Sequence, residues 1–324
     1  MSTQVLPGRW PTSTRLGRVR LAAGYGLLLA VVPYAALKVA WLSGSPVGIP
    51  AGSPARTEFG VANAITLALD LAVVVVALAL THRWGQRLPA WTVLLPAWVG
   101  TGFLIPVVGQ VAVGFGYGLL TSGRLVDLEN GLVDGPTYTL VYASFAAQGL
   151  LLTLCFVLYA RVRWASVLDR ETALRPTVER IYTTLPRTLA GAGAAAALLV
   201  GGARLYQAVA APDSWRAEPW TFYTRVTQGV EGLLAVAAAV GVLALAYGAS
   251  RVRTAHGVVF AWTGSAVLFS WGMFVTVAAV SRAPLSEGIT PPAAVVSLVS
   301  LLAGLVVALA GVLTLGRLPG RPAA

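Results

Sequence analysis

The chain has 324 residues, of which 57% are hydrophobic and only 11% are charged. Soluble globular proteins carry roughly 25% charged residues, so this composition excludes an ordinary soluble domain. The net charge of +11 does not indicate a nucleic-acid partner, because the basic residues flank apolar segments and form no recognisable nucleic-acid-binding motif.

Eight apolar segments follow one another along the chain, each of about 22 to 24 residues. About 20 apolar residues cross the roughly 30 Å hydrocarbon layer of a bilayer as a helix. Because lipid offers the backbone no hydrogen-bond partners, each segment must be helical. We therefore predict an all-α integral membrane protein with about eight transmembrane helices, whose segments are Leu21–Leu42, Gly60–Thr81, Ala90–Val113, Tyr138–Ala160, Leu189–Ala211, Val226–Ala249, Val258–Val280 and Pro292–Leu315.

The distribution of arginine predicts the orientation of these helices. The N-terminal segment and the loops on its side of the membrane contain sixteen arginines, against five on the opposite side. Basic loops stay in the cytoplasm, so both termini are expected there. The first apolar segment is long enough to span, so we expect it to remain as a helix and not to be a cleaved signal. Arginine almost without lysine is typical of a high-GC bacterium, which places the chain in a bacterial cell membrane.

This orientation predicts which positions an impermeant thiol reagent reaches from outside. The background is Cys155→Ser, because Cys155 is the only cysteine of the chain. Cysteines in the predicted outer loops should react in intact cells, namely those placed at Ser45, Ser122 and Ser286. Cysteines on the predicted inner side should react only after permeabilisation, namely those placed at Ser13, Thr172 and Arg321. Labelling of position 172 from outside would overturn the orientation.

The segment 161–187 differs from the other predicted connections. Its apolar residues recur at near-helical spacing, and Glu171 and Arg175 form a favourable pair four residues apart. Pro176 is expected to interrupt the pattern. The segment is predicted to be a cytoplasmic amphipathic linker, which either lies on the inner membrane surface or packs on the helix ends.

Two short similarities indicate an internal duplication. The residues around Trp98 in the third segment match those around Trp262 in the seventh, at an offset of 164. Lys38 and Arg204 lie late in the first and fifth segments, at an offset of 166. We therefore predict two tandem four-helix repeats. The expected organisation is an N-terminal segment 1–20, a first repeat 21–160, the linker 161–187, a second repeat 188–316 and a tail 317–324.

The first half also carries a family resemblance. Its pattern runs from Pro33 and Tyr34 through Trp41, then through Gly44 to Pro50, Leu88-Pro89 and residues 96–100. This pattern resembles a family of small four-helix membrane proteins of unknown function from high-GC bacteria, over roughly residues 20–160. The resemblance implies a four-helix membrane fold and no activity. The second half departs from it in the loop that contains Trp215 and Pro219.

Asp70 is the most unusual polar residue, because it lies about ten residues from either end of the second segment. A charged side chain at this depth costs a few kcal/mol on insertion scales. It must therefore face a partner or a cavity, or be protonated. Proton or cation handling is one interpretation, and structural pairing with another helix is the other.

Lys38, Arg204 and Glu231 lie nearer the outer ends of their segments. Lys38 is close enough to the boundary for its ammonium to reach the interface by snorkelling. Arg204 and Glu231 lie deeper on neighbouring segments and would neutralise each other as an ion pair. Alternatively, the cations Lys38 and Arg204 form an outward-facing anion site. Amide side chains add hydrogen-bonding capacity and serve either a ligand or helix association: Asn63, Gln148 and Gln228.

Other motifs do not indicate chemistry. The GYG triplet at 116–118 follows a full span, so we interpret it as part of a glycine-rich helix end, at the start of the outer loop expected at 114–137. His82 and His256 lie alone at helix ends, and no cofactor, metal or catalytic motif is present, so none of these groups is predicted. The sequence therefore favours transport or binding of a small molecule or ion, through polar groups between the repeats. A non-catalytic membrane partner or helix-mediated oligomer is the alternative, and an enzyme with a lipid-soluble substrate is a weaker one.

Overall fold

The computed structural model describes residues 15–53, 55, 59–121, 132–164, 180–215, 220–248, 254–281 and 288–316. Every regular element in these ranges is a helix, and eight of the helices are long and apolar enough to cross a membrane. The predicted all-α membrane fold is confirmed at this level. The tandem repeat stays a prediction.

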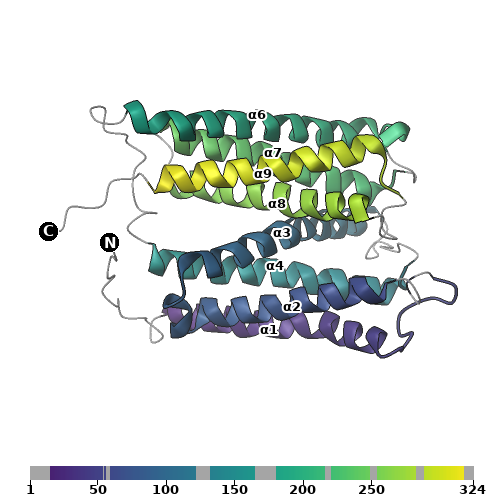
Figure 1. Ribbon diagram of the computed structural model, residues 1–324. Coiled ribbons are helices and arrows are strands. Elements are labelled where there is room, and N and C mark those ends of the chain that lie inside the picture. Colours follow the sequence, from purple (N-terminus) through teal and green to yellow (C-terminus); the bar gives the residue numbers. More distant parts are fainter. Residues whose placement is uncertain are drawn as a thin grey trace. The chain divides into compact units, whose positions relative to one another are not determined.

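Among the described residues, the eight helices of membrane-spanning length follow the order of the predicted segments, and Figure 1 shows their arrangement within each unit. Their bounds are α1 Arg15–Leu42, α2 Gly60–Thr81, η2 Arg83–Gln86, α3 Ala90–Thr121, α4 Gly135–Arg163, α6 Arg180–Ala210, η3 Asp213–Trp215, α7 Phe222–Tyr247, α8 Thr254–Ser281 and α9 Pro291–Leu315. Helix α2 has the predicted bounds. Helix α6 begins well before the predicted Leu189, and most of the predicted linker, residues 165–179, lies outside the described residues.

Helix α3 continues past Val113 to Thr121, so the expectation that the outer loop begins at Gly114 is wrong. The reason is tertiary packing against α7. Tyr117 stacks on Phe222, with ring centroids 4.1 Å apart, and a Cβ atom at Gly114 would lie 2.6 Å from the Tyr223 hydroxyl oxygen. These contacts override the poor helix propensity of glycine.

The chain divides into two compact units. Unit 1 comprises residues 1–97 and 128–165, and unit 2 comprises residues 98–127 and 166–324. Helices α1, α2 and α4 belong to unit 1, and α6, α7, α8 and α9 belong to unit 2. Helix α3 begins in unit 1 and ends in unit 2.

In unit 1, α1 packs against both α2 and α4, with α2 and α4 also in contact (Figure 1). Leu27, Leu80 and Leu152 are almost completely buried among these helices. At the end of α4 the Tyr159 hydroxyl donates to the Gly85 carbonyl at 3.0 Å. The Arg163 guanidinium donates to the carbonyls of Gly85, at 3.2 Å, and Leu88, at 2.8 Å. These bonds clamp the α2–α3 connection onto α4.

The opposite end of α4 is capped by Asp134. Its carboxylate accepts a hydrogen bond from the Thr137 backbone N–H at 2.8 Å, and its own backbone N–H donates to the Gly48 carbonyl at 2.9 Å. Hydrogen bonds from the Thr137 side chain and backbone hold the pKa of Asp134 below its ordinary value. A side-chain acceptor at this position satisfies a helix N–H that has no partner within the helix. The α1–α2 loop is thereby attached to the start of α4.

Unit 2 contains a four-helix bundle in which each helix packs on the next and α9 returns to α6 (Figure 1). Its core consists largely of alanine and valine, including Ala197, Ala235, Ala238, Val242 and Val307. Small residues let helix backbones approach closely, which is how helices associate where lipid removes the hydrophobic driving force between them.

Glycines of α7 and α8 mark close approaches between helix backbones in unit 2. A Cβ atom at Gly264 would lie 2.3 Å from the Leu234 carbonyl oxygen of α7, and one at Gly272 would lie 2.4 Å from the Leu301 backbone nitrogen of α9. On α7, a Cβ atom at Gly241 would lie 2.3 Å from the Ala261 backbone nitrogen. Helix α8 is therefore in close backbone contact with both α7 and α9.

Large apolar side chains also lie on the outside of the helices. Leu29 is 72% exposed and Val61 is 75% exposed. A soluble domain rarely exposes large contiguous apolar patches, whereas a bilayer covers such a surface. The apolar exterior agrees with a polytopic membrane protein.

Candidate functional site

The predicted polar residues form two groups, one in each unit. Lys38, Asn63, Asp70 and Gln148 belong to unit 1, and Arg204, Gln228 and Glu231 belong to unit 2. All of them are buried except Gln228, which is partly buried. The expected polar residues are therefore buried, as a membrane interior requires of them.

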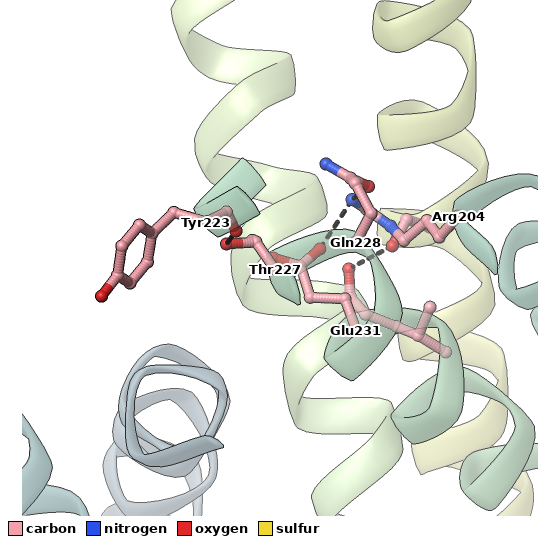
Figure 2. Close-up of polar contacts among 7 residues, drawn as sticks. Arg204, Tyr223, Thr227, Gln228 and Glu231 are labelled. Atoms are coloured by element: carbon pink, nitrogen blue, oxygen red, sulfur yellow. Dashed lines mark hydrogen bonds and ion pairs between the residues drawn. The ribbon is translucent and has the colours of Figure 1, made fainter. Parts of the chain in front are cut away.

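In unit 2 the predicted ion pair between Arg204 and Glu231 is confirmed (Figure 2). The Arg204 Nη1 atom lies 2.6 Å from the Glu231 Oε2 atom. The same nitrogen donates to the Gln228 Oε1 atom at 2.8 Å. Gln228 and Glu231 are three residues apart, so they share one face of α7 and meet the arginine of α6 together.

The surroundings of this pair hold α6 and α7 in register. The Arg225 guanidinium donates to the carbonyls of Ala208 and Val209, at 2.7 Å and 2.6 Å, and so caps the last turn of α6. Thr227 donates to the Tyr223 carbonyl within α7 at 2.9 Å (Figure 2). A buried acid and a buried base that contact each other directly neutralise each other, so this group is a structural tie between the two helices.

In unit 1, Lys38 does not reach out of the helix bundle. Its side chain is buried, with 6% exposure, and its Nζ atom donates to the Asn63 Oδ1 atom at 2.7 Å. The ammonium also lies 4.4 Å from the ring centre of Tyr34 and 4.9 Å from that of Trp41. The snorkelling interpretation is therefore wrong, because a hydrogen bond and two aromatic faces hold the cation inside the unit.

Asp70 lies on the same face of α2 as Asn63. It is 5% exposed, and its Oδ2 atom is buried without a hydrogen-bond partner among the described residues. Lys38 interacts with it electrostatically, but within the described part of the chain no salt bridge joins the two. Asp70 is thus a buried acid that interacts electrostatically with a cation whose hydrogen bond goes to Asn63.

Tyr34 completes this group from α1. Its side chain is hydrogen-bonded to that of Thr66, which lies between Asn63 and Asp70 on α2. Its ring meets Phe145 of α4 edge to face, with centroids 4.6 Å apart. We call Tyr34, Lys38, Trp41, Asn63, Thr66 and Asp70 the unit-1 polar group.

Sequence reasoning missed three members of this group, namely Tyr34, Trp41 and Thr66. The signal was present on α1, because Tyr34, Lys38 and Trp41 are four and three residues apart and therefore share one helix face. Thr66 follows Asn63 by three residues and precedes Asp70 by four. What the sequence does not show is that these two faces meet.

Gln148 has a different role. Its Nε2 atom donates to the Ala30 carbonyl of α1 at 3.3 Å and to the Ser144 hydroxyl at 3.4 Å, and that hydroxyl also donates to the Ala30 carbonyl. The amide therefore joins α4 to α1, as expected of polar residues that associate helices.

The two groups follow the same plan along the sequence. In each unit a cation of one helix donates to an amide of the next, from Lys38 to Asn63 and from Arg204 to Gln228. The acid follows the amide by three residues in unit 2 and by seven in unit 1. With the shorter spacing, the acid of unit 2 forms a direct ion pair with its cation. With the longer spacing, the acid of unit 1 keeps a carboxylate oxygen without a hydrogen-bond partner among the described residues.

Comparison of the chain with protein-family models, with curated protein sequences and with solved structures finds no match. The site must therefore be interpreted from its own geometry.

Proposed function

We propose that this membrane protein binds or transports a small molecule or ion, and that the unit-1 polar group holds it. The observation that carries the proposal is the buried Oδ2 atom of Asp70, which has no hydrogen-bond partner among the described residues. An unsatisfied carboxylate oxygen inside a membrane protein is costly, because neither lipid nor a neighbouring donor replaces its water.

The unit-2 group shows what a purely structural arrangement of a cation, an amide and an acid looks like. There the acid contacts its cation directly, and both partners of Arg204 lie within 2.8 Å of it. A structural role for Asp70 would favour the same direct contact with Lys38. Its absence supports a role in which Asp70 exchanges partners, as binding and release of a ligand require.

The substitution Asp70→Asn tests this function. The purified protein is reconstituted into liposomes, and solute gradients are applied one at a time, with sodium, potassium, chloride and neutral amino acids as probes. We expect at least one gradient to give a flux above that of empty liposomes. In Asp70→Asn this flux should fall at least about ten-fold while thermal stability changes little, because the amide keeps the shape of the side chain and removes its charge.

Asp213→Asn is the matched control, since it removes one exposed acid by the same chemical change. It should leave the flux unchanged. The proposal is contradicted if Asp70→Asn and Asp70→Leu both transport like the parent. It is also contradicted if no gradient gives a flux above empty liposomes and none of the probes binds the purified protein, a result that would favour a non-catalytic membrane partner.

A further inference from the structure

The Lys38 ammonium has hydrogen-bonding capacity that its surroundings do not use. An ammonium group carries three N–H donors. Among the described residues its one oxygen acceptor is the Asn63 side chain, and two aromatic faces cover much of the rest. An acceptor atom that approached Lys38 would therefore find a free donor on a positively charged group.

The corresponding cation of unit 2, Arg204, already contacts an acid and an amide. A single nitrogen of Arg204 serves both Glu231 and Gln228, so its charge is neutralised by direct contact. Of the two cations that the sequence places at equivalent positions, Lys38 is the one that retains capacity for an anion.

The charge of the unit-1 polar group controls when an anion can enter. With Lys38 positive and Asp70 negative the group is neutral, and a bound anion would leave a net negative charge in a medium of low dielectric constant. Among the described residues, the ionisable groups that interact electrostatically with Asp70 are Lys38 and Tyr34 of α1, and Tyr142 of α4 interacts in the same way with Tyr34. Tyrosine is uncharged near neutral pH. Asp70 is therefore the group whose charge can change to accommodate an anion.

The unpaired Oδ2 atom of Asp70 can take up a proton, because a proton needs no cavity to bind there. We infer that the unit-1 polar group takes up a small monovalent anion at Lys38 together with a proton at Asp70. The proton adds to the Asp70 carboxylate, and the anion accepts a hydrogen bond from Lys38. The group is neutral before and after binding. This inference rests on the proposed function and names its ligands.

Isothermal titration calorimetry with sodium nitrate and sodium chloride tests the inference on the full-length protein in detergent. Titrations in buffers of different ionisation enthalpy measure the protons taken up with each anion. We expect uptake of about one proton per anion, and an affinity that rises about ten-fold for each unit by which the pH is lowered while Asp70 is ionised in the free protein. Sodium gluconate, whose anion is bulky, is the control for ionic strength.

The decisive variant is Asp70→Asn, because we expect it to bind the anion more tightly than the parent at high pH. The neutral amide resembles protonated aspartate, so the variant should bind nitrate at high pH as tightly as the parent does at low pH, with no proton uptake. Lys38→Met should not bind the anion. Asp213→Asn should behave like the parent.

The inference is overturned if Asp70→Asn binds the anion no better than the parent at high pH, if its proton uptake persists, or if the parent binds neither anion at any pH. Should the flux of a cation or a neutral solute depend on Asp70 while no anion binds, this inference fails and the proposed function stands. A well-folded Asp70→Asn protein with the parent's melting temperature makes each result interpretable.

Discussion

Replacing Glu231 with leucine is expected to lower the free energy of unfolding by roughly 3–5 kcal/mol, because it leaves the buried guanidinium of Arg204 without its counter-charge. Gln228 would still accept a hydrogen bond from Arg204 but cannot neutralise it. The measurement is reversible unfolding in mixed detergent micelles, followed by tryptophan fluorescence.

The double variant Arg204→Met, Glu231→Leu separates the charge from the packing. Apolar side chains of similar volume often replace a buried ion pair without loss of stability, so the double variant should recover most of the stability lost by the single one. A double variant as unstable as Glu231→Leu would mean that lost packing, not the stranded charge, explains the effect. In contrast, Asp70→Asn should cost much less, because no salt bridge holds Asp70 in the described part of the chain.

Gly264→Ala is expected to destabilise unit 2 by about 3 kcal/mol, at the upper end of the usual cost of overpacking. The added methyl group would lie 2.3 Å from the Leu234 carbonyl oxygen and 2.6 Å from the Ala238 backbone nitrogen. These are backbone atoms, so α7 and α8 must move apart to relieve the clash. The same unfolding assay measures the loss, and fewer intact molecules should be recovered after purification.

Gly202→Ala is the matched control, since Gly202 lies in α6 and a Cβ atom there meets nothing within 4 Å. Alanine is the better helix former by about 1 kcal/mol, so this variant should be as stable as the parent or more stable. Equal effects of the two substitutions would show that helix propensity, and not the contact between α7 and α8, determines the cost at Gly264.

The helices were predictable because lipid imposes a simple rule. A run of about 20 apolar residues must satisfy its own backbone, and each predicted segment overlaps one helix. The pairing of Arg204 with Glu231 was predictable for a related reason, since two opposite charges on neighbouring helices have few other ways to be buried. Strong constraints of this kind are visible in a sequence without knowledge of the packing.

The features that were not predictable depend on which helix faces meet. Near the end of a transmembrane segment, a lysine flanked by aromatic residues is typical of the membrane interface. In the structure α2 instead presents Asn63 to Lys38, and the rings of Tyr34 and Trp41 cover the cation. Helix α3 likewise continues through its glycines at 114–118, because residues in this part of α3 contact α7. Both the burial of Lys38 and the length of α3 depend on how each helix is rotated about its own axis relative to its neighbours. The pattern of apolar residues does not specify that rotation.

The clamp of Tyr159 and Arg163 on the α2–α3 connection has a mechanical consequence. Hydrogen bonds to the carbonyls of Gly85 and Leu88 attach one end of α2 to α4, so any rocking of α2 pivots about that end. The unit-1 polar group includes Asn63, close to the other end of α2, where the lever arm is longest. If α2 rotates slightly about the attached end, its residues move in proportion to their distance from that end. The amide of Asn63, which binds Lys38, would therefore move further than most of α2.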